Sequence, residues 1–281
     1  MRIGRNGRAA FPAMGTVVTV VLPGAVPADG HAPVLGRVVD AFAALEARFS
    51  LYRDDTDLAR IRDGALRLTD ADEVVRDAYA LALRWRSATE GVFSPHRPDG
   101  VLDLDGVVKA LAIEQAGDVL DDAGVADWCV DAGGDALVRG HGPGGGPWVA
   151  GIVDPGDRAR VATTAVLDGA RRAIATSGTA ERGAHVWSTP GRRPLVQSSV
   201  VAPDIVTADV LATAVLAGGR AMLDLVQRDW DVDVFAVTDD DRVVRSAGWP
   251  SAPSHPLAAL GSAPADRPDQ ATLTPSSAPI A

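Results

Sequence analysis

The chain has 281 residues, enough to bury a substantial core in one large domain or two small ones. Its formal net charge of −10 argues against a general nucleic-acid binder and against a protein that binds anionic membranes, because both need a basic face. The single cysteine, Cys129, excludes an internal disulfide and a cysteine-rich metal site, and its apolar neighbours predict a buried structural thiol.

In chain order, the apolar pattern predicts a mixture of strands and helices. Residues 17–22 form a β-branched run that is typical of a buried strand. Helical spacing of apolar residues predicts helices over residues 35–49 and 75–85, and a third helix that follows Lys109 and ends near Gly124. The other expected elements are strands at 128–132, 136–139, 148–153, 161–167, 173–176 and 198–201, helices at about 207–218 and 220–228, and a hairpin of 232–237 with 242–245.

Helices and strands follow one another without strict alternation, which favours an α+β fold with one mixed sheet flanked by helices. We expect residues 1–10 to be a flexible amino terminus, 11–249 one folded domain, and 250–281, rich in proline, alanine and serine, a disordered tail. No run approaches the length of a membrane span, and no apolar stretch follows the first basic residues. The sequence therefore predicts a cytoplasmic protein without a membrane span.

Lysine is almost absent from this chain, which has 26 arginines but only one lysine, Lys109. An ammonium is a compact charge that suits a phosphate or carboxylate in a tight site, where the planar guanidinium would not fit. Asp103, Asp105 and Gly106 precede it, so the glycine permits close backbone approach and the coming helix offers its amino-terminal dipole to an anion. The sequence alone leaves open a surface lysine retained by chance beside an ordinary turn.

A carboxylate and a hydroxyl are spaced by one helical turn at Asp209 and Thr213. Oxygen ligands so placed can bind a hard cation such as Mg²⁺ and leave room for phosphates. Alternatively, Thr207 or Asp209 only stabilises the helix start, and Thr213 bonds to its own helix.

A third polar segment, residues 174–185, delivers Ser177 and then His185 from a predicted strand. No G-x-S-x-G elbow surrounds Ser177, so a serine hydrolase is disfavoured. No two of the five histidines stand at zinc-ligand spacing, and a lone histidine such as His185 is more often structural than catalytic.

Taken together and in order, these segments resemble the ApbE-like family of FAD:protein FMN transferases. The resemblance spans roughly residues 11–244, and its ordered motifs are jointly more specific than any one of them. The matching segments are residues 13–16, 48–58, 91–95, 103–109, 132–135, 176–186 and 208–213.

The resemblance implies a single α/β domain that binds FAD and Mg²⁺, transfers FMN to a threonine hydroxyl of an acceptor protein and releases AMP. It implies that Asp209, Thr213 and the carbonyl of Gly106 hold the metal. Lys109 would lie near the FAD phosphates, and His185 or a nearby carboxylate would accept the threonine proton. The residues implied to contact FAD are Met14, Tyr52, Phe93, Ser94, Asp103, Lys109, Ser177 and Val186.

The chain also departs from the family pattern. Ser94 replaces an aspartate, Ala110 a glycine and Arg62 an asparagine, and residues 185–191 lack the aspartate usual after the histidine. Two other functions therefore stay open: a flavin-binding protein without turnover, and an Mg²⁺-dependent FAD pyrophosphatase that forms FMN and AMP without an acceptor.

Overall fold

The computed structural model describes residues 1–3, 7–24, 28–178 and 195–252. The described strands of the larger sheet are β1 Arg2–Ile3, β2 Arg8–Ala13, β3 Thr16–Val21, β4 Trp128–Ala132, β5 Asp135–Arg139, β8 Ala173–Gly178, β9 Leu195–Ala202, β10 Asp233–Thr238 and β11 Val243–Arg245. A second sheet pairs β6 Trp148–Val153 with β7 Val161–Leu167. The described helices are α1 Ala28–Phe49, α2 Asp57–Arg62, α3 Glu73–Ala88, α4 Asp105–Asp122 and α6 Ile205–Asp229.

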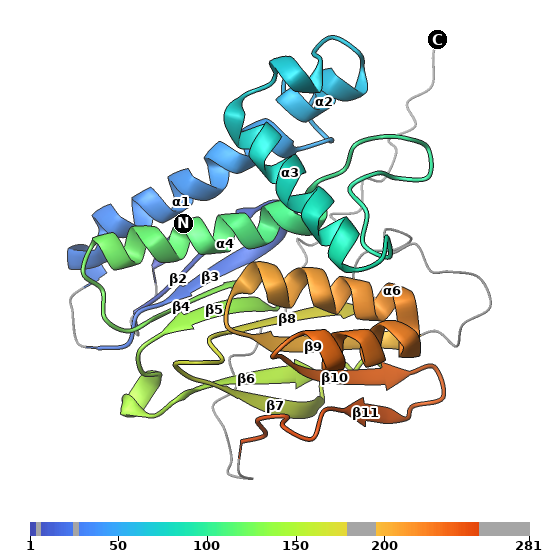
Figure 1. Ribbon diagram of the computed structural model, residues 1–281. Coiled ribbons are helices and arrows are strands. Elements are labelled where there is room, and N and C mark those ends of the chain that lie inside the picture. Colours follow the sequence, from blue (N-terminus) through green and yellow to red (C-terminus); the bar gives the residue numbers. More distant parts are fainter. Residues whose placement is uncertain (4–6, 25–27, 179–194, 253–281) are drawn as a thin grey trace, which may run out of the picture.

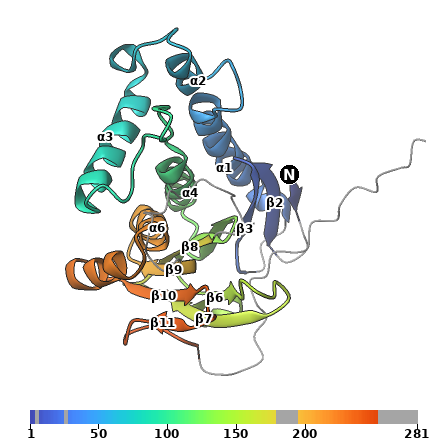
Figure 2. The ribbon, with the colours of Figure 1, turned by 90° about the vertical axis from the view of Figure 1, so that its right-hand side faces the viewer.

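The predicted α+β class is confirmed, with one difference in the sheet. Among the described strands the order is β1-β2-β3-β4-β5-β8-β9-β10-β11. Each of these neighbouring pairs is antiparallel, whereas the sequence predicted a mixed sheet. Segregation of the helices to one face of an antiparallel sheet is typical of an α+β fold. Figures 1 and 2 show α1, α4 and α6 covering that face, while α2 and α3 lie farther from the sheet.

Helix α4 is the central element of the helical layer. It packs between α1 and α6 and against β4, so its side chains are buried around most of its circumference. Gly117 brings it close to the sheet, because a Cβ at this position would lie 2.6 Å from the ring of Trp128. Lys109, in the second turn of this buried helix, is therefore carried into the interior.

A second core lies on the other face of the sheet, where β6 and β7 pack (Figures 1 and 2). Cys129 is fully buried in it, and burial raises the pKa of its thiol, which confirms the predicted structural cysteine. Trp249 closes this core by packing on Phe235 and donating its indole N–H to the carbonyl of Thr164 at 3.1 Å.

Helix α6 joins the two helices predicted at 207–218 and 220–228. The helix kinks at Gly219, whose φ of 60° is left-handed and suits glycine. By length and composition α6 could cross a membrane, but 78% of its most apolar stretch is buried inside the fold, as a core helix requires. The cytoplasmic location stays a prediction.

Both chain ends differ from the sequence-based expectation. Residues 8–10, placed in a flexible terminus, belong to β2, and the Leu22 N–H bonds to the carbonyl of Gly7 at 2.8 Å. At the other end, the carbonyl of Pro250 accepts the N–H of Val166 at 2.7 Å, so the folded part continues past residue 249. The remainder of the predicted tail, residues 253–281, lies outside the described residues.

Candidate functional site

The only lysine is buried between two carboxylates. The Lys109 ammonium forms an ion pair with Asp135 of β5 and lies 3.8 Å from the Oδ2 atom of Asp209 on α6. The exposed fractions of these three side chains are 9%, 1% and 6%. Buried charges persist only when they are paired, so Lys109 is not a surface lysine retained by chance.

Asp209 and Thr213 lie one turn apart on α6, as predicted, and Thr207 helps to stabilise the helix start, as the alternative allowed for that residue. Asp204 caps the helix, because its carboxylate accepts both the N–H and the hydroxyl of Thr207 at 2.8 Å. The Thr213 hydroxyl bonds instead to the hydroxyl of Ser177 on β8 at 2.9 Å. A polar row therefore runs from the Ser177–Thr213 pair to Asp209 and on to Lys109.

Gly106 lies three residues before Lys109, near the start of α4. A Cβ at this position would meet the ring of Phe93 at 2.8 Å, so the glycine lets the ring lie directly against the helix backbone. The Asp103 carboxylate accepts the Asp105 N–H at 3.0 Å and thereby organises the turn that starts the helix. The helix begins at Asp105, whereas the sequence predicted a helix that follows Lys109, so Lys109 is inside it.

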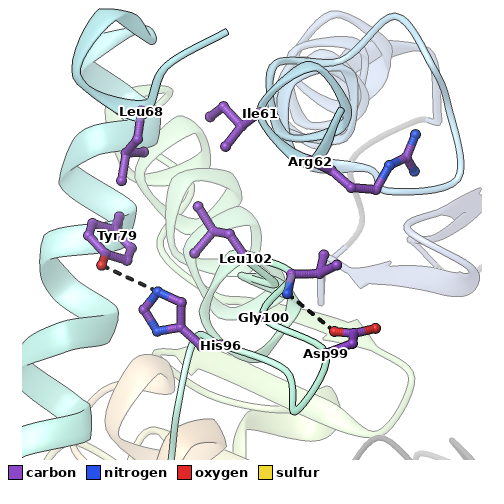
Figure 3. Close-up of a pocket in the computed structure, with 9 residues that line it drawn as sticks. Ile61, Arg62, Leu68, Tyr79, His96, Asp99, Gly100 and Leu102 are labelled. Atoms are coloured by element: carbon purple, nitrogen blue, oxygen red, sulfur yellow. Dashed lines mark hydrogen bonds between the residues drawn. The ribbon is translucent and has the colours of Figure 1, made fainter. Parts of the chain in front are cut away.

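Two cavities lie beside the start of α4. The first, of about 340 Å³, lies between α2, α3 and the chain before α4, and Figure 3 shows Ile61, Leu68 and Leu102 on its walls. The Tyr79 hydroxyl faces His96 Nε2 at 3.4 Å there, and the two rings pack edge to face. A second cavity of about 230 Å³ shares three lining residues with the first; its lining is Leu51, Tyr52, Arg62, Arg97, Asp99, Val101, Asp103 and Asp105.

The structure places the other predicted FAD contacts in different surroundings. Tyr52 is 84% exposed and lines the second cavity together with Asp103. Met14 packs at the edge of the main core with a left-handed φ of 50°. Ser94 makes a local turn, in which its hydroxyl accepts the N–H of His96 at 3.1 Å. His185 and Val186 lie outside the described residues.

Sequence reasoning included Asp135 in the matching segment 132–135, which contains Gly133-Gly134-Asp135, but did not place it in the site. Gly133 and Gly134 both have positive φ, so the chain reverses in two residues between β4 and β5. That turn sets Asp135 at the first position of β5, opposite Ala132. The signal that could have identified it is a charged residue directly after a tight turn of two glycines.

A model of the ApbE family matches residues 94–236, about half of the chain. The chain belongs to the ApbE family. The matched region contains Lys109, Asp135, Asp209 and Thr213, whereas Met14 and Tyr52 precede it.

Curated relatives carry the name FAD:protein FMN transferase. The relative from Salmonella typhimurium is 30% identical over 152 residues, which are 50% of this chain and 43% of the relative. The relative from Escherichia coli K12 is 28% identical over 155 residues, 51% of this chain and 44% of the relative. The chain thus spans less than half of the length of these relatives.

Solved ApbE structures share the fold. An ApbE protein from Thermotoga maritima aligns with a TM-score of 0.70 and 20% identity, covering 85% of this chain and 96% of that one. The flavin transferase ApbE from Vibrio cholerae aligns with a TM-score of 0.67 and 20% identity, over 85% and 96% of the two chains. At this identity the likeness establishes the fold alone.

Proposed function

We propose that the protein transfers the FMN moiety of FAD to a threonine hydroxyl of an acceptor protein, requires Mg²⁺ and releases AMP. The observation that carries the proposal is the burial of Lys109 beside Asp209, which itself lies one helical turn from Thr213 on α6. An ammonium next to two oxygen donors is suited to a metal-bridged diphosphate. The ApbE family, whose curated members here are named FAD:protein FMN transferases, supports flavin transfer in general.

The residues present fit a magnesium ion. The Asp209 carboxylate, the Thr213 hydroxyl and the Gly106 carbonyl are all oxygen donors, which Mg²⁺ prefers. Among the described residues no group of three or more His, Cys, Asp or Glu side chains could hold a metal ion. Mg²⁺ is commonly held by one or two carboxylates together with phosphate oxygens, so the substrate phosphates would complete the proposed site. When bound, the ion would neutralise charge that develops on the diphosphate.

In the proposed reaction the acceptor hydroxyl oxygen bonds to the FMN phosphorus as the bond to the bridging oxygen breaks. AMP leaves with that electron pair, and the hydroxyl proton passes to a base, for which His185 is our candidate. Lys109 holds a phosphate oxygen of FAD by charge. Ser177, bonded to the Thr213 hydroxyl, would fix the orientation of that hydroxyl.

The cavities beside α4 support the binding of a ring system next to this cluster. The second cavity reaches Asp103 and Asp105 at the start of the helix that carries Gly106 and Lys109. Tyr52 at its edge offers an exposed aromatic face on which a flat ring can stack. We therefore assign Tyr52, Phe93 and Asp103 to the flavin side of the proposed substrate.

Mass spectrometry of an acceptor protein tests the transfer. The protein is incubated with FAD, Mg²⁺ and an acceptor protein of the Salmonella typhimurium relative, and we expect the mass of one FMN moiety on an acceptor threonine. Asp209→Ala should abolish this product. An unmodified acceptor would contradict the proposal: FAD binding alone would then indicate a flavin-binding protein, and release of FMN and AMP would indicate a pyrophosphatase.

A further inference from the structure

The Asp135 carboxylate makes two contacts that reach in different directions. Its Oδ1 atom accepts the backbone N–H of Thr176 at 2.9 Å, and its Oδ2 atom pairs with the ammonium of Lys109. At 1% exposure it is among the most buried charged groups that the structure describes. Both oxygens are thus engaged with protein groups, so Asp135 is poorly placed to bind a substrate or a metal itself.

The contact with Thr176 has a structural reason. Strand β5 pairs with β8 at Ala136 and Leu137, and the chain then turns away at Gly133 and Gly134. The N–H of Thr176 lies beyond this pairing, and a buried N–H without an acceptor would be costly. The Asp135 side chain replaces the missing strand as acceptor. This hydrogen bond holds the carboxylate at a fixed position beneath α4.

The contact with Lys109 determines which of two carboxylates pairs with the ammonium. Two buried carboxylates, those of Asp135 and Asp209, face this one ammonium, which lies in direct contact with the first and 3.8 Å from the second. An ammonium in full contact with Asp209 would oppose a divalent cation there, both by charge and by occupying an oxygen. The partner of Lys109 therefore influences the affinity of Asp209 for a cation.

We infer that Asp135 is a positioning residue that draws the Lys109 ammonium away from Asp209 and so reduces the charge repulsion that a Mg²⁺ ion at Asp209 would meet. This inference rests on the proposed metal site. The turn of Gly133, Gly134 and Asp135 thereby contributes to metal affinity, whereas Lys109 contacts the substrate. The remaining separation of 3.8 Å still allows Lys109 to reach a phosphate oxygen bound at the metal.

The test is a titration with Mn²⁺, a spectroscopic substitute for Mg²⁺, in which electron paramagnetic resonance measures the free ion, first with Mn²⁺ alone and then with saturating FAD. Asp135→Asn keeps an oxygen for the Thr176 N–H but removes the charge that holds Lys109. We expect Mn²⁺ affinity to fall about tenfold or more, as for other residues that orient a metal ligand. Asp118→Asn, at an exposed position of α4, removes the same net charge and should leave the affinity unchanged.

The double variant Asp135→Asn/Lys109→Met separates this role from a general loss of structure. With the ammonium gone, its charge no longer opposes a cation at Asp209, and Mn²⁺ affinity should return to the wild-type range. Unchanged affinity in Asp135→Asn, or equally weak binding in the double variant, would overturn the inference. If the inference is overturned in this way, Asp209→Asn shows whether the proposed metal site fails with it. Wild-type Mn²⁺ binding by Asp209→Asn would mean that the metal site itself is wrong. Loss of Mn²⁺ binding would mean that only the role of Asp135 is wrong.

Discussion

The β4–β5 hairpin presents two aspartates to opposite faces of the nine-stranded sheet, and the surroundings of the two carboxylates differ. Asp135, opposite Ala132, lies on the helix-covered face and is paired with Lys109. Asp131, opposite Ala136, lies on the other face. Burial and then the charge of Asp135 raise its pKa to about 6, and a backbone hydrogen bond from Gly134 and the charges of Arg8 and Lys109 offset this only in part. Burial alone therefore does not keep a carboxylate charged for a binding site; at Asp135 the ammonium of Lys109 provides the pairing charge.

Removal of the ammonium should have the largest effect. Lys109→Met leaves Asp135 and Asp209 buried without their shared cation, so we expect the free energy of unfolding to fall by about 3 kcal/mol. Urea denaturation at neutral pH measures it. Arg53→Met, which removes an ion pair with Asp55 at the exposed surface, should leave the stability unchanged. Equal stability of the Lys109→Met variant and the wild type would show that this cluster is not buried in solution.

Neutralising the aspartate on the other face should act in the opposite direction. The pKa of Asp131 in the fold, about 6, lies above its ordinary value of 3.8, so the folded state holds the proton more tightly. This contribution to stability is present at low pH and is lost as the pH rises through about 6. Asp131→Asn should therefore raise the Tm at about pH 8 and have little effect near pH 4.

Calorimetric melting curves of wild type and Asp131→Asn at the two pH values check this sign. A variant that is less stable than the wild type at the higher pH would mean that Asp131 has a cationic partner in solution, as Asp135 has.

Close packing at the start of α4 should give the next effect. Gly106→Ala places a methyl group 2.8 Å from the Phe93 ring, so the ring must move, at a cost of about 1–3 kcal/mol. Gly36→Ala in α1 is the matched control, because a Cβ there meets nothing within 4 Å. Alanine in that open helical position should stabilise the protein by up to about 1 kcal/mol. If both variants shift stability in the same direction, the contact between Phe93 and Gly106 is not formed.

The smallest effect should come from the core behind the sheet. Trp249→Phe keeps an aromatic ring near Phe235 but loses the hydrogen bond to Thr164, which is worth about 1 kcal/mol. FAD binding, measured by the quenching of flavin fluorescence, should be unchanged, because the proposed FAD site lies on the helix-covered face of the sheet. Weaker FAD binding in this variant would show that the two faces are coupled.

Much of the fold could be predicted from residues with regular spacing. The buried strands and the helices with an apolar face were expected at nearly the observed positions, including the break at Gly219. Helix α2 was missed because six residues give too short a period, and Thr56 alone marks its start by accepting the Ala59 N–H. Strand β2 was missed because Pro12 and Arg8 weaken its pattern; the neighbouring strands β1 and β3 supply its pairing.

The site was predictable only in part, for a physical reason. The spacing of Asp209 and Thr213 is local, so the sequence could place both on one helical face. The role of Asp135 depends on three elements far apart in the chain: α4 with the ammonium, α6 with the second carboxylate, and β8 with the N–H of Thr176. No local pattern encodes such a meeting, and tertiary packing alone reveals it.

Calorimetric titration of FAD into wild-type protein and Asp209→Ala, each with and without Mg²⁺, examines the proposed site most directly. We expect Mg²⁺ to strengthen FAD binding to the wild type and to have no effect on the variant, because the carboxylate on α6 is the proposed charged ligand of the metal. The same Mg²⁺ dependence in both proteins would place the metal elsewhere and contradict the assignment of Lys109, Asp209 and Thr213 to one diphosphate site.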